Sequence, residues 1–300
     1  VGNRHVYGLS GMEPVCQLRY YRTMTATKLT TITVEKPWGR TSLWPGFDNP
    51  SGAKIGEIWF EAPEGSNPDL MVKYLFTSEK LSIQVHEDDA TALAAGRERG
   101  KDEAWVILAA EPDATIALGT HVSVDSATLR SAALDGSIET LVDWKPAKAG
   151  DVIYSAARTV HAIGAGLTLI EVQQNVDLTY RLYDYGRPRE LHLQAGVAVS
   201  DAVPFVAPPI PGDIGGGRSI LCEGGKFVLE RWSWSGARSL SLPPQLPGWL
   251  IPVTGGGAID GARFVAGECW MIEGSAAVDV EAGSDILFAY PLITRAALFD

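Results

Sequence analysis

The stretch LSIQVHEDD, residues 81–89, has a polar face that either lies in water or binds a group inside the fold. Its first six residues alternate, so that the apolar positions 81, 83 and 85 fall on one face of a strand. Ser82, Gln84 and His86 fall on the opposite face. One interpretation is a surface strand whose polar face lies in water. The other is that Gln84 and His86, two residues apart, point together at a bound group.

Short β-like segments continue from Leu29 to the end of the chain, separated by turn residues at the spacing of an all-β barrel or sandwich. The expected strands cover 29–34, 55–61, 70–75, 81–86, 103–109, 114–118, 151–155, 159–163, 167–173, 179–183, 218–222, 226–232, 248–253, 256–259, 262–264, 268–272, 277–280 and 285–290. Helical patterns are few, at 88–99, where Asp88 or Asp89 suits an N-cap, and at 125–144. The sequence therefore predicts an all-β fold with a few short helices in its first part.

The run AVPFVAPPIPGDIGGG at 202–217 is rich in proline and glycine and is typical of a connection between domains. It predicts a larger domain over 24–203 and a smaller one over 204–300. Residues 1–23 show neither a strand nor a helix period. We expect them to be a disordered extension with little functional content, and the folded chain to begin near Met24.

Composition narrows the classes of function. The chain has 300 residues, 46% apolar, and a net charge of −11, which argues against nucleic acid as a partner. An anionic substrate would then need a locally basic pocket. No apolar run reaches the length of a membrane span, and no secretory signal is recognisable. Cys16, Cys222 and Cys269 lie far apart without a CxxC motif, so a reducing cytoplasm is the expected location.

Histidine placement restricts where a metal site can be. The five histidines all lie at or before position 192, so a histidine metal site must belong to the first domain. His5 lies in the expected extension, and His121 follows in what is expected to be a loop. His192 lies in a segment whose alternation suits solvent exposure. His86 and His161 remain, the second in GDVIYSAARTVHAIGAG, residues 150–166. Each alone is compatible with a structural histidine. Glu103, a carboxylate leading into an apolar strand, either needs a partner or marks the strand's end.

Taken in order, four segments resemble the type I mannose-6-phosphate isomerases of the shorter bacterial branch. They are LSIQVHEDD, GKDEAW at 100–105, GDVIYSAARTVHAIGAG, and IEVQQNVDLTYRLYDYGRPRELHL at 170–193. VEKPWGR at 34–40 and GEIWFEAP at 56–63 extend the resemblance, which covers 30–195 by motif. The last third resembles the family only in its rhythm of strands and turns. The resemblance implies two cupin (jelly-roll) domains: a catalytic, metal-binding one over 24–203 and a cupin-like one without a metal site over 204–300.

The resemblance also implies one divalent metal ion, zinc, held by Gln84, His86, Glu103 and His161. Two imidazoles and one carboxylate are typical of catalytic zinc sites, here with an amide oxygen as fourth ligand. A single carboxylate leaves the ion with a net charge of about +1, so that it stays an effective Lewis acid.

The activity implied is the interconversion of mannose 6-phosphate and fructose 6-phosphate through an enediolate. In the family an arginine stabilises the developing negative charge, and the motif places it at Arg181. Lys101 would help to position the substrate, and Ser82 would bind its phosphate. Glu171 and Asp177 match acidic positions of the family. Either one transfers protons or orients the arginine.

Two positions depart from the family pattern. Glu87 stands where proline usually follows the first histidine, and Arg158 stands where the loop before the second histidine usually has glycine. Loss of glycine removes easy access to positive φ, and the arginine either adds to phosphate binding or narrows the mouth of the site. Two alternatives therefore stay open: an isomerase of another sugar or sugar phosphate, and a non-enzymatic, metal-binding cupin that senses sugar. Arg181 and Lys101 favour an enzyme, because metal storage needs neither.

Overall fold

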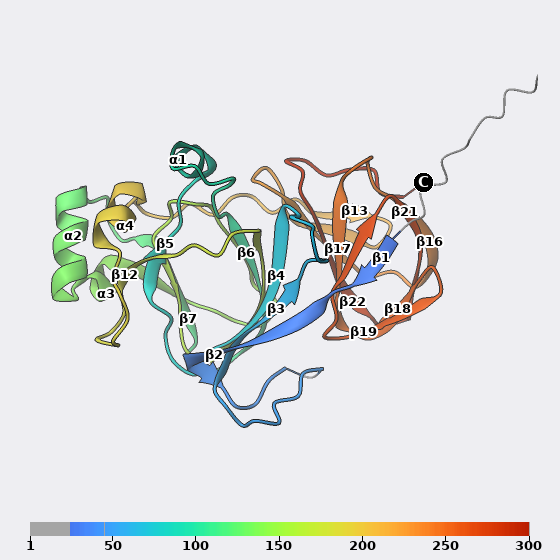
Figure 1. Ribbon diagram of the computed structural model, residues 1–300, viewed down its shortest axis with the longest axis horizontal. Helices are drawn as coiled ribbons and strands as arrows, with labels where there is room; N and C mark the ends of the chain where they lie inside the picture. The colour runs from blue at the N-terminus through green and yellow to red at the C-terminus, as the bar shows by residue number, and fades with distance from the viewer. Residues whose placement is uncertain (1–24, 45, 300) are drawn as a thin grey trace, which may run out of the picture.

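The computed structural model of this protein describes residues 25–44 and 46–299 (Figure 1). In that part of the chain, antiparallel β-strands dominate and the helices are few and short. The prediction of a mostly β fold is confirmed. The expected extension at 1–23 lies outside the described residues.

Two sheets form the first half of the molecule. The six-stranded sheet contains, in spatial order, β2 (Thr30–Arg40), β3 (Ile55–Glu61), β4 (Leu70–Phe76), β11 (Leu167–Gln174), β6 (Glu103–Ala110) and β9 (Val152–Ser155). The five-stranded sheet contains β12 (Tyr180–Tyr183), β5 (Ile83–Val85), β10 (His161–Ile163), β7 (Thr115–Thr120) and β8 (Val142–Pro146).

Two further sheets form the second half. The seven-stranded sheet contains β1 (Thr25–Lys28), β20 (Trp270–Glu273), β17 (Pro247–Thr254), β22 (Asp285–Tyr290), β15 (Val228–Trp232), β14 (Arg218–Cys222) and β13 (Gly212–Gly215). The four-stranded sheet contains β16 (Gly236–Ser241), β21 (Ser275–Val280), β18 (Gly256–Ile259) and β19 (Ala262–Val265).

The helices lie in the first half, mainly at its outer end. They are α1 (Asp89–Ala94), α2 (Ser126–Asp135), α3 (Ile138–Leu141) and α4 (Leu193–Val199). Asp88 is the N-cap of α1, and its side chain accepts a hydrogen bond from the N–H of Thr91, as the sequence predicts. None of the helices in the described residues is long and apolar enough to cross a membrane.

The four sheets stack in series along the long axis of the molecule, with α2, α3 and α4 covering the outer face of the five-stranded sheet (Figure 1). One buried apolar cluster fills the space between the five- and six-stranded sheets and includes Trp105, Ile116 and Leu169. Another lies between the seven- and four-stranded sheets. Each sheet thus buries its apolar side chains against a neighbour, as layered β architectures require.

The largest apolar cluster joins the two halves. It contains Val72 and Ile170 from the six-stranded sheet together with Trp249 and Leu287 from the seven-stranded sheet, all nearly inaccessible to solvent. The chain also crosses between the halves at its start, because β1 pairs with β20 in the seven-stranded sheet. The halves on either side of residue 204 therefore share one core.

Several elements, among them helix α4 and three short strands, were not expected from the sequence. The strands β1, β13 and β16 are short and rich in glycine, threonine or serine, and their places are set by pairing with β20, β14 and β21. The pattern at 125–144, which predicts one or two helices, forms α2 and α3, and only its last residues differ from the expectation. Gly136 adopts φ +84° and ends α2, and the last residues form β8 against β7.

The shared core predicts that the two halves unfold together. Trp249→Ala should destabilise the protein by about 3–5 kcal/mol, because it removes a fully buried indole and leaves a cavity. Denaturant unfolding, followed by both fluorescence and circular dichroism, should show one transition moved to lower denaturant. Leu134→Ala, at an exposed position of α2, is the control and should shift it little. Two separate transitions in the wild-type protein would contradict the shared core.

Candidate metal centre and adjoining cavity

The candidate site lies between the five- and six-stranded sheets. In the five-stranded sheet Gln84 of β5 pairs in register with His161 of β10 on one side and with Arg181 of β12 on the other. Residues paired directly across antiparallel strands project from the same face of a sheet. The inward face therefore carries Arg181, Gln84 and His161 side by side, although Gln84 and His161 are 77 residues apart in sequence.

The six-stranded sheet supplies the opposite wall. Glu103 begins β6, and Glu171 of β11 pairs in register with Lys73 of β4 and with Trp105 of β6. The indole of Trp105 donates a hydrogen bond of 3.1 Å to Glu171 and its ring meets His161 edge-on, with centroids 5.5 Å apart. The two sheets thus bring their polar side chains together in the space between them.

Glu103 and the two histidines form a compact, buried cluster. Their ligand atoms lie within 4.8 Å of one another. Glu103 Oε1 is 3.2 Å from His161 Nε2, and Oε2 is 3.5 Å from His86 Nε2. Each imidazole is fixed from behind. His86 Nδ1 is 2.9 Å from the carbonyl oxygen of Leu178, and His161 Nδ1 is 2.8 Å from that of Thr159.

These contacts determine the tautomers. A carbonyl oxygen only accepts hydrogen bonds, so each Nδ1 carries the proton and each Nε2 turns a lone pair towards Glu103. Burial lowers the pKa of His86 to about 3 and also lowers that of His161, so both rings are neutral near pH 7. Burial disfavours ionisation of Glu103, but Lys101, His86 and His161 together outweigh the effect of burial, and the pKa of Glu103 falls well below its usual value.

The donor set fits a divalent cation. Two imidazole lone pairs face an ionised carboxylate, and among the described residues neither Glu103 oxygen has a hydrogen-bond partner of good geometry. Buried acceptors in this arrangement need a positive centre between them. Backbone carbonyls that orient the outer nitrogens are typical of zinc-bound histidines. His86, Glu103 and His161 therefore fit a zinc ion.

Gln84 and Lys101 border the cluster. The amide nitrogen of Gln84 is 3.3 Å from His161 Nε2, and its oxygen accepts a 3.0 Å hydrogen bond from Ser82. Lys101 Nζ is 2.9 Å from Glu103 Oε2 and 3.3 Å from His86 Nε2. Lys101 lies two residues before the first residue of β6, Glu103. Burial disfavours its charge, yet the carboxylates of Glu103 and Glu171 raise its pKa above the usual range.

A cavity of about 340 Å³ adjoins the cluster. Five cationic side chains line it against three carboxylates, so it is locally basic although the chain carries a net charge of −11. This is the basic pocket that an anionic substrate requires. The charged residues that line it are Lys36, Lys73, Lys101, Arg181, Arg189, Glu57, Glu171 and Asp177. Ser82 and Gln84 also reach it.

Glu171 and Asp177 occupy different environments in this cavity. Glu171 is buried, and burial together with the charge of Glu103 raises its pKa to about 7. Asp177 is exposed. Arg181 donates a 2.6 Å hydrogen bond from Nη1 to the carbonyl of Glu190, while its buried Nε has no partner within the described part of the chain. His192 is half-buried, and its Nδ1 accepts the main-chain N–H of Arg181 at 3.1 Å, in contrast to the expected solvated role.

Sequence reasoning missed several residues of the cavity, among them Lys73 and Glu57. Lys73 is buried, lies 3.8 Å from Glu171, and has its ammonium 4.3 Å from the centre of the Trp59 ring. Burial lowers the pKa of Lys73. Both residues could have been identified from the sequence, as charges inside the apolar strands LMVKYLF at 70–76 and IGEIWFE at 55–61. A charge inside an apolar strand requires a buried partner.

The two departures from the family pattern do not line this cavity. Arg158 adopts φ +73°, so it takes the left-handed conformation that glycine would favour. Its guanidinium forms two hydrogen bonds with Asp201, of 2.8 and 2.9 Å. Glu87 is buried and is bound by the guanidinium of Arg97 and by the hydroxyl of Tyr180. Both residues connect segments of the chain, and neither is among the residues that line the cavity.

Comparison with known proteins gives a consistent set of relatives. Mannose-6-phosphate isomerase ManA of Bacillus subtilis is 33% identical over 264 residues, which cover 80% of this chain and 77% of that protein. A crystal structure of the mannose 6-phosphate isomerase from Bacillus subtilis superposes with a TM-score of 0.77 at 25% identity, covering 89% of this chain and 99% of the other. A zinc-bound mannose 6-phosphate isomerase shares the fold with a TM-score of 0.66 at 15% identity, covering 89% and 99%. No family model matches this chain.

The cluster predicts one zinc ion per chain. Replacing His161 by alanine should remove most of the metal, since it deletes one of two imidazoles that face Glu103. Elemental analysis after dialysis measures the metal content. His121→Ala removes an exposed histidine and should keep the full content. Retention of the metal in a variant lacking both the Gln84 and His86 side chains would contradict the assignment.

Proposed function

Since this chain belongs to the mannose-6-phosphate isomerase family, we propose that it interconverts mannose 6-phosphate and fructose 6-phosphate. The observation that carries the proposal is that Gln84 and Lys101, which contact the Glu103 cluster, also line a basic cavity. Such a cavity suits a phosphorylated sugar, and its volume lies at the lower end of the range of about 300–1,000 Å³ typical of small-molecule sites. Nucleic acid and membrane are not among the partners that we propose.

We propose that Gln84, His86, Glu103 and His161 hold a zinc ion. When bound, zinc supplies a Lewis acid that polarises the oxygens of the sugar. Lys101, next to Glu103, supplies a further positive charge beside the cluster. The remaining chemistry belongs to the side chains that line the cavity.

The reaction needs a proton to leave the carbon next to the carbonyl and to return to the neighbouring carbon. Glu171 suits this transfer better than Asp177 does. It lies buried in the cavity wall, where burial raises its pKa above the usual range of a carboxyl group. The bound cation would lower this pKa, because a positive charge favours the carboxylate. Asp177, exposed among the residues that line the cavity, would orient cationic groups.

Arg181 would stabilise the negative charge of the enediolate. It stands beside Gln84 in the register of the five-stranded sheet and lines the cavity. Its Nη1 is anchored on Glu190 and its main-chain N–H on His192, so the guanidinium is held before the substrate arrives. A preorganised donor of this kind acts where charge develops in the transition state.

Ser82 would contact the phosphate. Its hydroxyl lies at the cavity wall, near the Gln84 end of the cluster. For Arg158 we propose a structural role, since Asp201 occupies its guanidinium and residues 158–161 lead to His161.

The architecture proposed for this activity is a pair of cupin barrels. The five- and six-stranded sheets would form a metal-binding barrel within 24–203, and the seven- and four-stranded sheets a second barrel within 204–300. β1 would belong to the second barrel in space, although it precedes residue 204 in sequence. A cytoplasmic location stays a prediction from the sequence.

A coupled assay on purified, zinc-loaded protein tests the proposed function. Fructose 6-phosphate should appear from mannose 6-phosphate at a rate proportional to the bound zinc, and a chelator should abolish it. Other aldose phosphates and unphosphorylated mannose are the comparison substrates. If one of them is turned over faster than mannose 6-phosphate, that compound would be the proposed substrate instead. If the protein binds zinc but turns over none of them, a sensing role would be favoured.

Arg181→Ala should lower kcat by about 10²- to 10³-fold while raising KM much less, because the guanidinium acts mainly on charge that develops in the transition state. Arg181→Lys should recover activity only in part, since lysine keeps the charge and loses the planar fork. Steady-state kinetics together with metal analysis measure both effects. Unchanged kcat in a fully metallated Arg181→Ala protein would rule the role out.

Ser82→Ala should raise KM for the sugar phosphate and leave kcat nearly unchanged, because a phosphate contact is made equally in ground and transition states. Arg158→Ala should leave KM unaltered, since the Arg158 side chain is bound to Asp201 outside the cavity. Kinetics on both variants distinguish the two positions. If KM rises only in Arg158→Ala, the phosphate contact would be assigned to Arg158 and not to Ser82.

A further inference from the structure

The second half of the molecule contacts the segment that carries Lys101 and Glu103. The turn between β14 and β15 reaches across to the first half, and two groups of Lys226 make polar contacts there. The main-chain N–H of Lys226 donates a 3.0 Å hydrogen bond to the hydroxyl of Tyr154. The ammonium of Lys226 is 2.7 Å from Asp89 Oδ2.

The first contact continues to Asp102. The hydroxyl of Tyr154 donates to Asp102 Oδ2 at 2.5 Å, and Asp102 Oδ1 accepts the N–H of Ala157 at 3.0 Å. Asp102 is buried and lies between Lys101 and Glu103 in sequence. Tyr154 therefore connects the second half directly to the main chain that carries these two side chains.

The second contact reaches the same segment by another route. Asp89 Oδ1 accepts the N–H of Gly100 at 2.8 Å and the side-chain amide of Gln174 at 3.0 Å. Gln174 in turn accepts the N–H of Asp102 at 2.9 Å through its side-chain oxygen. Both routes from Lys226 thus end on residues 100–102, which we call the lysine segment.

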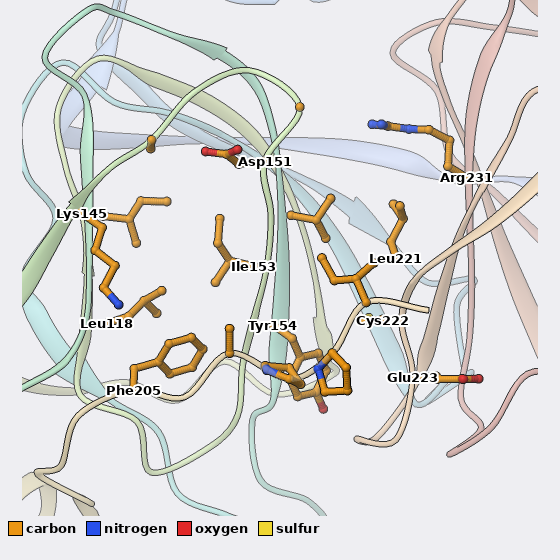
Figure 2. A pocket seen from close by; sticks show the side chains of 18 of the residues that line it. Leu118, Lys145, Asp151, Ile153, Tyr154, Phe205, Leu221, Cys222, Glu223 and Arg231 are labelled. Atoms are coloured by element: carbon orange, nitrogen blue, oxygen red, sulfur yellow. The ribbon is translucent and has the colours of Figure 1, made fainter. Parts of the chain in front are cut away.

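The approach of the turn is closely fitted. A Cβ atom on Gly225 would lie 1.9 Å from the hydroxyl of Tyr154, so a side chain at this position is excluded while Tyr154 keeps its place. Phe227 packs on the ring of Tyr154 with centroids 5.5 Å apart. Tyr154 also borders a largely apolar cavity of about 550 Å³ between the halves, where Cys222 lies close by (Figure 2). The hydrogen bonds of the hydroxyl with Lys226 and Asp102 add to this packing in holding Tyr154.

We propose that Tyr154 and Lys226 are positioning residues of the isomerase site, which hold the lysine segment so that Lys101 and Glu103 meet the histidines. This inference rests on the proposed function. It assigns to the second half of the chain a part in the reaction, although all four proposed zinc ligands belong to the first half. Neither residue touches the cluster itself. Each acts through the backbone of residues 100–102.

Tyr154→Phe and Lys226→Ala test the proposal, each removing one route while leaving the apolar contacts largely intact. Zinc affinity, measured by competition with a chromophoric chelator, should fall by about 3- to 30-fold in each variant, in the range of couplings transmitted through packed networks. At saturating zinc, kcat should fall with little change in KM, because the lysine segment borders the reacting centre. Lys226→Arg keeps the ion pair with Asp89 and should restore both quantities towards the wild-type values.

Two variants serve as matched controls. Tyr74→Phe removes a buried hydroxyl that has no hydrogen-bond partner among the described residues, and Lys148→Ala removes an exposed ammonium that forms no ion pair there. Melting temperatures show whether each protein is folded. The proposal is overturned if Tyr154→Phe and Lys226→Ala match these controls in zinc affinity and in kcat.

The outcomes of these measurements distinguish a failure of the positioning role from a failure of the proposed function. If the wild-type protein isomerises mannose 6-phosphate while the variants behave as the controls do, only the positioning role fails. If the wild-type protein binds zinc without isomerising the substrate, the proposed function fails, and the chelator competition still decides whether the second half positions the lysine segment.

Discussion

The buried carboxylate of Glu103 is the constraint on which the site depends. An ionised carboxylate enclosed between two sheets is costly unless positive charge or hydrogen-bond donors compensate for it. Among the described residues, the ammonium of Lys101 is the one full positive charge within ion-pair distance of Glu103, and the two neutral imidazoles offer only lone pairs. The arrangement is balanced when a divalent cation lies among the three side chains. The carbonyls of Leu178 and Thr159 fix the ring tautomers that direct the Nε2 lone pairs towards such a cation.

The same two sheets are apolar at one part of their interface and charged at another. Trp105 belongs to both parts, because it packs in the apolar cluster while its indole N–H binds Glu171. Opposite charges then alternate along the wall, with Lys73 between Glu171 and Glu57. Pairing of this kind makes buried charge tolerable and keeps the groups in fixed positions. The apolar part gives the charged part a rigid frame, which a preorganised site needs.

The metal-binding half is not an independent unit. Its six-stranded sheet buries one face against the seven-stranded sheet, and β1 hydrogen-bonds to β20 of the second half. Lys226 adds polar contacts that end at the segment bearing Lys101 and Glu103. The second half thus has a physical connection to the site, through packing and through hydrogen bonds, while supplying none of the four proposed ligands.

Local pattern by itself determined much of this protein. Alternation in 81–86 predicted that Gln84 and His86 share one face, and apolar runs between turn residues predicted most strands, because a strand's period of two is written in consecutive residues. Tertiary structure alone decided which distant side chains meet. His161 reaches Gln84 only through the pairing of β10 with β5, and Lys73 and Glu57 enter the cavity through sheet register. The positive φ of Arg158 and its pairing with Asp201 likewise depend on contacts across the fold. Such contacts follow from the packing of whole sheets. The periodicity of a short stretch of sequence does not say which distant strands will pair.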